Sequence, residues 1–226
     1  MSQVTGHRHS GMSGFKFPSW YVSNPTLSEE DAALAKRSWS LVVENKAAGY
    51  LKIKGSREDF PSCVSFFYES FYKRLFEVEP ASRALFKGNM DTQGKALTKM
   101  IGVALSLVKT DVNTLVGALQ GLARGHASKG VKSTQYGTVG EVLLYTLEKV
   151  LGSDAFDSAT KHSWVVIYSL MMSVIIPVAL LEEKKYTEVE KVKTPNNAFF
   201  TPAVFSAVVL AGLFLASYFS SSAASR

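Results

Sequence analysis

The sequence predicts an all-α protein, with one helical domain over residues 26–183 and a further helix at residues 199–219 that is long enough to cross a membrane. Three observations support this prediction. Apolar residues recur at helical spacing along most of the chain. Hydrophobic residues make up 46% of the 226 residues, which is enough to bury one substantial core. Residues 199–219 carry no charge at all.

The net charge of +6 comes from scattered lysines and arginines, and no stripe interleaves them with exposed aromatic residues. Nucleic acid is therefore not a predicted partner. The excess of basic residues does favour attraction to anionic membranes. Cys63 is the only cysteine, so no disulfide can form within the chain, which fits a reducing compartment.

Residues 1–25 are rich in Ser, Gly and His and lack helical periodicity, so we expect a disordered tail there. The residues Thr26-Leu-Ser-Glu29 have the form of a capping box, and acidic residues occupy the turn that follows. A first helix is predicted from this box to about Asn45, with Trp39 on its core face. Residues 46–62 are predicted to be a solvated loop with room for a short helical turn.

A second helix is predicted from Cys63 to about Phe76, and its apolar residues form two adjacent rows. One row is Val64, Phe67, Phe71 and Leu75, and the other is Tyr68, Tyr72 and Phe76. So many aromatic residues predict deep burial on both sides. Pro80 begins a short helix that leads to a corner at residues 87–89. A further helical stripe opens at Gln93 and continues to Val108.

The next helix carries a histidine near its end. Counting back from His126 in helical steps meets leucines at positions 122, 119 and 115, so the imidazole faces the interior. The helix begins after Thr110 or Asp111, and Gly130 can end it in a left-handed cap. A lone histidine on an apolar face is more often a satisfied core residue than a ligand. A helix that ends one turn later, however, presents the ring to the space between helices, so both interpretations stay open.

Two more helices are predicted, from Gln135 to Leu151 and from Ser158 to Glu183. Residues 163–181 contain no charge, so hydropathy alone allows a membrane span in the second of them. We expect a core helix instead, because the domain would otherwise lose one wall. Dimerisation or a nearby bilayer would then explain its excess of apolar surface.

The predicted C-terminal anchor follows a charged stalk at residues 184–198. At about 1.5 Å per residue, residues 199–219 give a helix of about 31 Å, which matches a hydrocarbon core of about 30 Å. Four lysines lie in the stalk before this run and only Arg226 lies after it. The positive-inside rule therefore places the helical domain in the cytosol, with a short tail at residues 220–226 beyond the single membrane span.

The chain contains three long motifs, FYKRLFEVEPASRALFKGNM, GHASKGVKSTQYGTVGEVLLYTLEKVLG and FDSATKHSWVVIYSLMMSVIIP. Together they resemble the globin family, in particular neuroglobin and the single-domain or flavohaemoglobin-type bacterial globins. The resemblance extends over about Leu27 to Glu183. It implies the globin fold, a sandwich of three helices over three, and a bound haem b. It also implies reversible binding of oxygen or of other diatomic gases such as NO and CO.

By this resemblance, His126 is the proximal ligand of the haem iron. Phe86 packs on the porphyrin, and the further residues that contact the cofactor are Gln93, Leu97, Val131 and Tyr136. The residues around the bound gas are Tyr72, Gln93 and Leu97. Bound dioxygen carries partial negative charge on its outer oxygen, so a tyrosine hydroxyl and a glutamine amide can both donate hydrogen bonds to it.

Gln93 stands where many animal globins have a distal histidine, which argues against an iron held by two histidines. Tyr72 together with Gln93 is typical of flavohaemoglobin-type globins, and Tyr136 matches their proximal tyrosine. Their partner glutamate would fall near Ala179, and no flavin or nicotinamide domain follows. Two alternatives therefore stay open: an NO dioxygenase or peroxidase-like enzyme with an external reductase, and a membrane-tethered gas or redox sensor. A homodimer is compatible with each of them.

Overall fold

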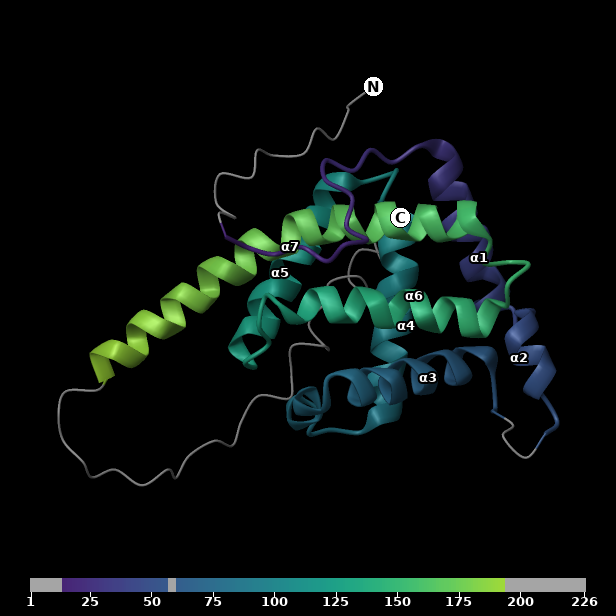
Figure 1. Cartoon of the computed structure of the whole chain (residues 1–226), viewed down its shortest axis with the longest axis horizontal. Helices are drawn as coiled ribbons and strands as arrows, with labels where there is room; N and C mark the ends of the chain where they lie inside the picture. Colours follow the sequence, from purple (N-terminus) through teal and green to yellow (C-terminus); the bar gives the residue numbers. More distant parts are fainter. Residues whose placement is uncertain (1–13, 57–59, 194–226) are drawn as a thin grey trace, which may run out of the picture. The chain divides into compact units, whose positions relative to one another are not determined.

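The computed structural model describes residues 14–56 and 60–193, with side chains through residue 188. Within these residues all regular elements are helical (Figure 1). They are α1 (Glu29–Val43), α2 (Ala48–Ile53), α3 (Cys63–Val78), the 3₁₀ helix η1 (Pro80–Leu85), α4 (Met90–Leu107), α5 (Val112–Ser128), α6 (Gln135–Leu151) and α7 (Ser158–Lys193). The predicted all-α fold class is confirmed in this part of the chain.

The chain divides into two compact units, Met1–Glu183 and Lys184–Arg226. In the second unit α7 continues to Lys193, so the predicted stalk is helical at its start. The rest of the stalk, the predicted membrane span at residues 199–219 and the tail after it lie outside the described residues.

A capping box begins α1, two residues later than the sequence suggests. Ser28 Oγ accepts a hydrogen bond from the Asp31 N–H at 3.0 Å, and the Asp31 carboxylate accepts from the Ser28 N–H at 3.1 Å. The box therefore starts at Ser28 and not at the predicted Thr26. Ala35 and Trp39 are buried on the inner face of the helix, as predicted for Trp39.

The centre of the domain is the contact between α3 and α6, which lie side by side (Figure 1). Members of both predicted apolar rows of α3 are almost fully covered, namely Phe67, Phe71 and Leu75 in one row and Tyr68 and Tyr72 in the other. This pair of helices is a rigid part of the domain, because close-packed interiors resist small displacements.

α7 forms one wall of this core over the residues of the first unit. Trp164 and Met172 are buried, and Trp164 Nε1 donates to Ser38 Oγ in α1 at 2.9 Å. Among the described residues, Ser158–Glu188 is a helix long and apolar enough to cross a membrane, but half of its most apolar stretch is buried in the domain. The burial agrees with the predicted core helix.

The segment at residues 46–62 contains the short helical turn that the sequence allows, but it packs against the domain and is not the predicted solvated loop. It contains α2, which packs against α6, and Tyr50 is only 2% exposed. A Cβ at Gly49 would lie 2.1 Å from the Lys149 carbonyl oxygen, so only glycine permits this approach of the two backbones. Residues 46–62 therefore extend the core at the C-terminal end of α6.

An N-terminal arm, residues 14–25, packs against α6 and α7. The centroids of the Trp20 and Tyr168 rings are 5.7 Å apart. Gly140 of α6 makes room for the arm, because a Cβ there would lie 2.5 Å from the Trp20 ring. The structure thus differs from the predicted disordered tail over this arm, whereas residues 1–13 lie outside the described part of the chain.

Candidate functional site

His126 lies at the end of α5, where the backbone ends the helix with two specific hydrogen bonds. The Val131 N–H donates to the His126 carbonyl at 3.1 Å, and the Gly130 N–H donates to the Ala127 carbonyl at 2.9 Å. Gly130 has φ +87°, the left-handed conformation of a Schellman cap. The predicted left-handed cap is confirmed, and it holds the His126 backbone in one orientation.

Burial and charge keep the His126 imidazole neutral. Loss of hydration, with a smaller contribution from the Lys129 ammonium, lowers the pKa of His126 to about 4. The ring is therefore uncharged at neutral pH. Neutral imidazole is the form that can donate a lone pair to a metal ion.

Tyr136, in the first turn of α6, contacts the His126 ring. Its hydroxyl oxygen lies 3.1 Å from His126 Nδ1, and the Tyr136 side chain is 5% exposed. Burial raises the pKa of Tyr136, with a smaller contribution from the Glu183 carboxylate, so the phenol keeps its proton. Tyr168 of α7 donates its hydroxyl proton to the Tyr136 carbonyl at 2.9 Å. With Nδ1 engaged in this way, Nε2 is the nitrogen available to a ligand.

A carboxylate belongs to this side of the site, although not at the position expected. The resemblance places a partner glutamate near Ala179, which is a buried alanine. The acidic residue near Tyr136 is Glu183, one turn further along α7. Its carboxylate accepts hydrogen bonds from the Ser133 N–H and, at 3.2 Å, from Ser133 Oγ. Glu183 therefore ties α7 to the loop between His126 and Tyr136.

Tyr72 and Gln93 meet where α3 faces the first turn of α4. The Tyr72 hydroxyl donates to the Gln93 backbone carbonyl at 3.3 Å, and Tyr72 is 8% exposed. Burial raises the pKa of Tyr72 to about 12, so the hydroxyl keeps its proton at neutral pH and acts as a donor. The Gln93 side chain is partly buried.

Phe86 joins this second group of residues. Its ring centroid lies 5.2 Å from that of Tyr72 and 5.4 Å from that of Phe76, both in edge-on geometry. Phe86, Leu97 and Val131 are partly buried and pack against the core. The predicted site residues thus form two groups, one around His126 and Tyr136 and one around Tyr72, Gln93 and Phe86.

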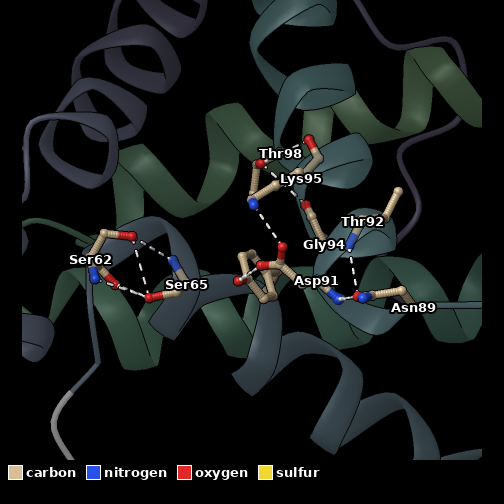
Figure 2. A network of polar contacts seen from close by, with 9 residues as sticks. Ser62, Ser65, Asn89, Asp91, Thr92, Gly94, Lys95 and Thr98 are labelled. Atoms are coloured by element: carbon tan, nitrogen blue, oxygen red, sulfur yellow. Dashed lines mark hydrogen bonds and ion pairs between the residues drawn. The ribbon is translucent and has the colours of Figure 1, made fainter. Parts of the chain in front are cut away.

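The first turn of α4 is held by a polar network that was not among the predicted site residues (Figure 2). Asn89 Oδ1 accepts from the Asp91 N–H at 2.8 Å and from the Thr92 N–H at 3.3 Å, which caps the helix. The Asp91 carboxylate also accepts from the Tyr68 hydroxyl and pairs with Lys95. The sequence signals for this network are Asn89 as a helix-capping residue and the i,i+4 pair of Asp91 and Lys95.

Residues 69–175 match the globin family. The chain is 29% identical to zebrafish (Danio rerio) neuroglobin over 161 residues, which cover 65% of this chain and 89% of that one. It is 28% identical to a flavohemoprotein of Halalkalibacterium halodurans over 170 residues, or 74% of this chain and 36% of the relative. A Rhizobium meliloti flavohemoprotein is 29% identical over 126 residues, or 54% and 30%. The chain thus spans about a third of the length of these flavohemoproteins.

Two solved structures share the fold. An engineered carbene transferase, made from a putative nitric oxide dioxygenase of Rhodothermus marinus, superposes with a TM-score of 0.54 at 21% identity and covers 73% of this chain and 99% of that one. A bacterial globin from Campylobacter jejuni superposes with a TM-score of 0.51 at 23% identity, over 71% and 99%. At such identities the likeness concerns the fold alone.

Proposed function

Because the chain belongs to the globin family, we propose that it binds haem b through His126 and binds oxygen or another diatomic gas reversibly at the iron. Membership of the family supports haem-based gas binding in general. The observation that supports His126 as the iron ligand is the contact between Tyr136 and His126 Nδ1, which leaves Nε2 of a neutral ring to bind the metal.

Haem, when bound, would supply an iron that can bind a nitrogen from the protein and a diatomic gas. The chain has the donor set for this group: one partly buried neutral imidazole whose Nδ1 contacts Tyr136, and partly buried apolar side chains at Phe86, Leu97 and Val131. The Phe86 ring offers a flat apolar surface that suits the apolar face of a porphyrin, and Leu97 and Val131 add aliphatic contacts. In this proposal the two groups of site residues lie on either side of the haem.

His126 and Tyr136 act as a unit on the proximal side. With Nε2 directed to the iron, Nδ1 carries the ring proton and donates it in a hydrogen bond to the Tyr136 oxygen. This bond fixes the ring orientation and makes the imidazole a stronger donor. Glu183 and Tyr168 hold the surrounding elements, since each joins α7 to residues just before or within the first turn of α6.

Tyr72 provides the hydrogen bond to the bound gas on the distal side. Its bond to the Gln93 carbonyl is long at 3.3 Å, so the hydroxyl can leave that carbonyl at low cost for a more strongly negative acceptor. The Gln93 amide is the second donor. Both donors favour dioxygen, whose bound form carries partial negative charge, over carbon monoxide.

Absorption spectra of the purified protein test this proposal. The ferrous protein should show a haem spectrum that changes on exposure to oxygen or carbon monoxide and returns when the gas is removed. Carbon monoxide should bind without delay if the sixth position is open. Protein that is purified with sufficient haem present and still contains none would contradict the proposal.

A second candidate function is NO dioxygenation, in which oxygen, NO and one electron from an external reductase give nitrate. It is favoured by the contact of His126 Nδ1 with Tyr136 and by Glu183 close to Tyr136. A strongly electron-donating ligand to the iron favours reaction of bound oxygen over its release. We expect NO consumption with matching nitrate formation when a flavin reductase and its nicotinamide are added. If NO disappears no faster than with free haem, the chain is a gas binder or a sensor.

We further propose that residues 199–219 anchor the protein in a membrane with the globin domain in the cytosol. The support is the uncharged run and the lysines before it. Removal of residues 198–226 should release a soluble protein with an unchanged haem spectrum. Full-length protein that already fractionates with the soluble proteins of the cell would rule out the anchor.

A further inference from the structure

Two tyrosines one turn apart on α3 reach the first turn of α4. Tyr72 donates to the Gln93 carbonyl at 3.3 Å, as described above. Tyr68, four residues earlier and therefore on the same face of α3, donates to Asp91 Oδ1 at 2.5 Å. The two hydrogen bonds thus hold one helical turn of α4 at two neighbouring points.

The bond from Tyr68 is the stronger of the two. Its acceptor is an ionised carboxylate, because Lys95 and Tyr68 itself lower the pKa of Asp91. Burial, together with the Asp91 carboxylate, raises the pKa of Tyr68 to about 12, so the phenol keeps its proton. Hydrogen bonds to ionised acceptors are shorter and roughly twice as strong as those between neutral groups. Lys95 stays near the carboxylate at 2.6 Å, and Figure 2 shows this pair beside the Asn89 cap.

The Tyr68 ring also rests directly on the backbone of α4. A Cβ at Gly94 would lie 2.3 Å from the ring carbons, a distance that real side chains do not adopt. The close approach of α3 and α4 therefore requires glycine at this position. Tyr68 contacts α4 on both sides of Gln93, through its hydroxyl at Asp91 and through its ring at Gly94.

This arrangement has a consequence for the distal side of the site. When the Tyr72 hydroxyl turns towards a bound gas, it gives up its bond to the Gln93 carbonyl. That carbonyl belongs to the turn that carries the second donor. Without another attachment, the first turn of α4 would be free to move just when both donors are needed. The contacts of Tyr68 do not depend on the gas.

We propose that Tyr68 is a positioning residue for gas binding, which keeps the first turn of α4 against α3 while Tyr72 exchanges the Gln93 carbonyl for the bound gas. The proposal rests on the gas-binding function proposed above. Tyr68 acts through Asp91 and Gly94, and it touches neither the gas nor the haem in this account. It would set the affinity for oxygen through the placement of Gln93.

The first test is amide hydrogen exchange on the full-length purified protein, and it needs no bound gas. Tyr68→Phe removes the hydroxyl and keeps the ring. We expect the amides of Asp91, Thr92 and Gln93 to exchange roughly tenfold faster or more, because loss of a hydrogen bond to a charged acceptor changes a local equilibrium by at least that factor. Lys95→Gln is the matched control: it removes the exposed ion pair and leaves the Tyr68–Asp91 bond, so exchange should change less than about twofold.

The second test is the rate of oxygen dissociation from the haem-loaded protein. Tyr68→Phe should raise this rate roughly tenfold in the native background and much less in a Tyr72→Phe background, because Tyr68 acts on the same donors. The infrared stretch of bound carbon monoxide should shift in Tyr68→Phe as well, which a general loss of stability would not produce. Asp91→Asn keeps an acceptor for Tyr68 and should have an intermediate effect, and it replaces Tyr68→Phe if that variant does not fold.

The outcomes separate the two proposals. Unchanged exchange at residues 91–93 in Tyr68→Phe overturns the positioning role, whatever the protein binds. Fully additive effects of Tyr68→Phe and Tyr72→Phe on oxygen dissociation also overturn it, because Tyr68 would then act independently of the distal donors. Faster exchange in a protein that takes up no haem would contradict the proposed function and leave the docking of α4 by Tyr68 supported.

Discussion

The Tyr136 hydroxyl oxygen lies 3.1 Å from Nδ1 of His126, and 10 residues separate the two along the chain. The short connection between α5 and α6 makes this contact possible, because the left-handed Gly130 turns the chain back within a few residues. An imidazole with one nitrogen engaged in this manner has a defined orientation and a defined tautomer on binding a metal. The contact is therefore the structural feature on which the proposed haem ligation depends most.

Tyr136→Phe should weaken haem binding. The substitution removes the acceptor for Nδ1–H and nearly preserves volume, so the imidazole becomes a poorer donor with a less restricted ring. Loss of such a partner typically costs 10- to 100-fold in metal affinity, and we expect haem to transfer to an excess of a haem-scavenging protein at least about tenfold faster. Tyr145→Phe is the control, since it removes a hydroxyl from an exposed position on the same helix. Equal transfer rates in Tyr136→Phe and the native protein would show that the contact is only packing.

Tyr72→Phe should selectively weaken oxygen binding. A hydrogen bond to a charged acceptor contributes about 1.5–3 kcal/mol, which corresponds to a roughly 10- to 100-fold faster dissociation of oxygen. Carbon monoxide, which is less polar when bound, should change far less. If Tyr72 and Gln93 share one acceptor, the effects of Tyr72→Phe and Gln93→Leu should not add. Flash photolysis and stopped-flow mixing measure both gases, and comparable losses for the two would mean that Tyr72 only packs.

The stability of the protein prepared without haem should depend on the charge of His126. The pKa of His126 is about 4 in the folded chain, below the ordinary 6.5 of an unfolded chain. Between these values the unfolded state binds a proton that the folded state does not. The contribution of the neutral ring to stability is therefore complete above about pH 6.5 and is lost as the pH falls towards 4, with a slope of at most about 1.4 kcal/mol per pH unit.

Urea unfolding at a series of pH values measures this dependence. His126→Leu should flatten the decline between pH 6.5 and 4, whereas removal of the exposed histidine in His162→Leu should leave it in place. A native protein whose unfolding free energy does not fall over this range would show that the His126 ring is already solvated in the folded state.

Gly130→Ala should destabilise the fold through the backbone alone. Gly130 has φ +87°, and the nearest atom to a new Cβ, Leu85 Cδ2, would lie at 3.9 Å, so sterics with neighbours play no part. An L residue in this conformation costs roughly 1–2 kcal/mol. Gly121→Ala in the exposed middle of α5 should instead raise the free energy of unfolding by about 0.5–1 kcal/mol. Urea unfolding compares the two variants, and equal effects would argue against the cap.

The elements that rest on local signals were predictable. Helical spacing gave the helix from Gln135 to Leu151 at its observed bounds, and Cys63 as the start of another. The left-handed cap at Gly130 follows from glycine's lack of a Cβ, which is a property of one residue. Inward placement of His126 follows from the leucines that precede it. Each of these inferences needs only residues within a few turns of one helix.

The features that were not predicted depend on pairs that are distant in sequence. The N-terminal arm is ordered because the Trp20 ring packs over Gly140. The 46–62 segment packs against α6 because Gly49, which has no Cβ, lets its backbone approach the Lys149 carbonyl. Glycines at such crossings look the same in the sequence as any other helical glycine. The capping box at Ser28 illustrates a smaller error, because Thr26 offers a similar local pattern two residues earlier.

The candidate site shows the same division. The residue types at positions 72, 93, 126 and 136 were available from the sequence, and so was the expectation that they serve one site. The role of Glu183 was not predictable. Counting residues along α7 led to Ala179, because the sequence of one helix does not show which of its turns faces α6. The contact of Tyr68 with Asp91 likewise joins two helices.

Haem titration of the haem-free protein, followed by absorbance, tests the central claim most directly. The native protein should take up one haem per chain, and His126→Ala should bind far more weakly and recover part of its spectrum when imidazole is added. His162→Ala, which removes a histidine from an exposed position on α7, should titrate like the native protein. Uptake by His126→Ala with the same stoichiometry, affinity and spectrum as the native protein would contradict the assignment of His126 as the iron ligand.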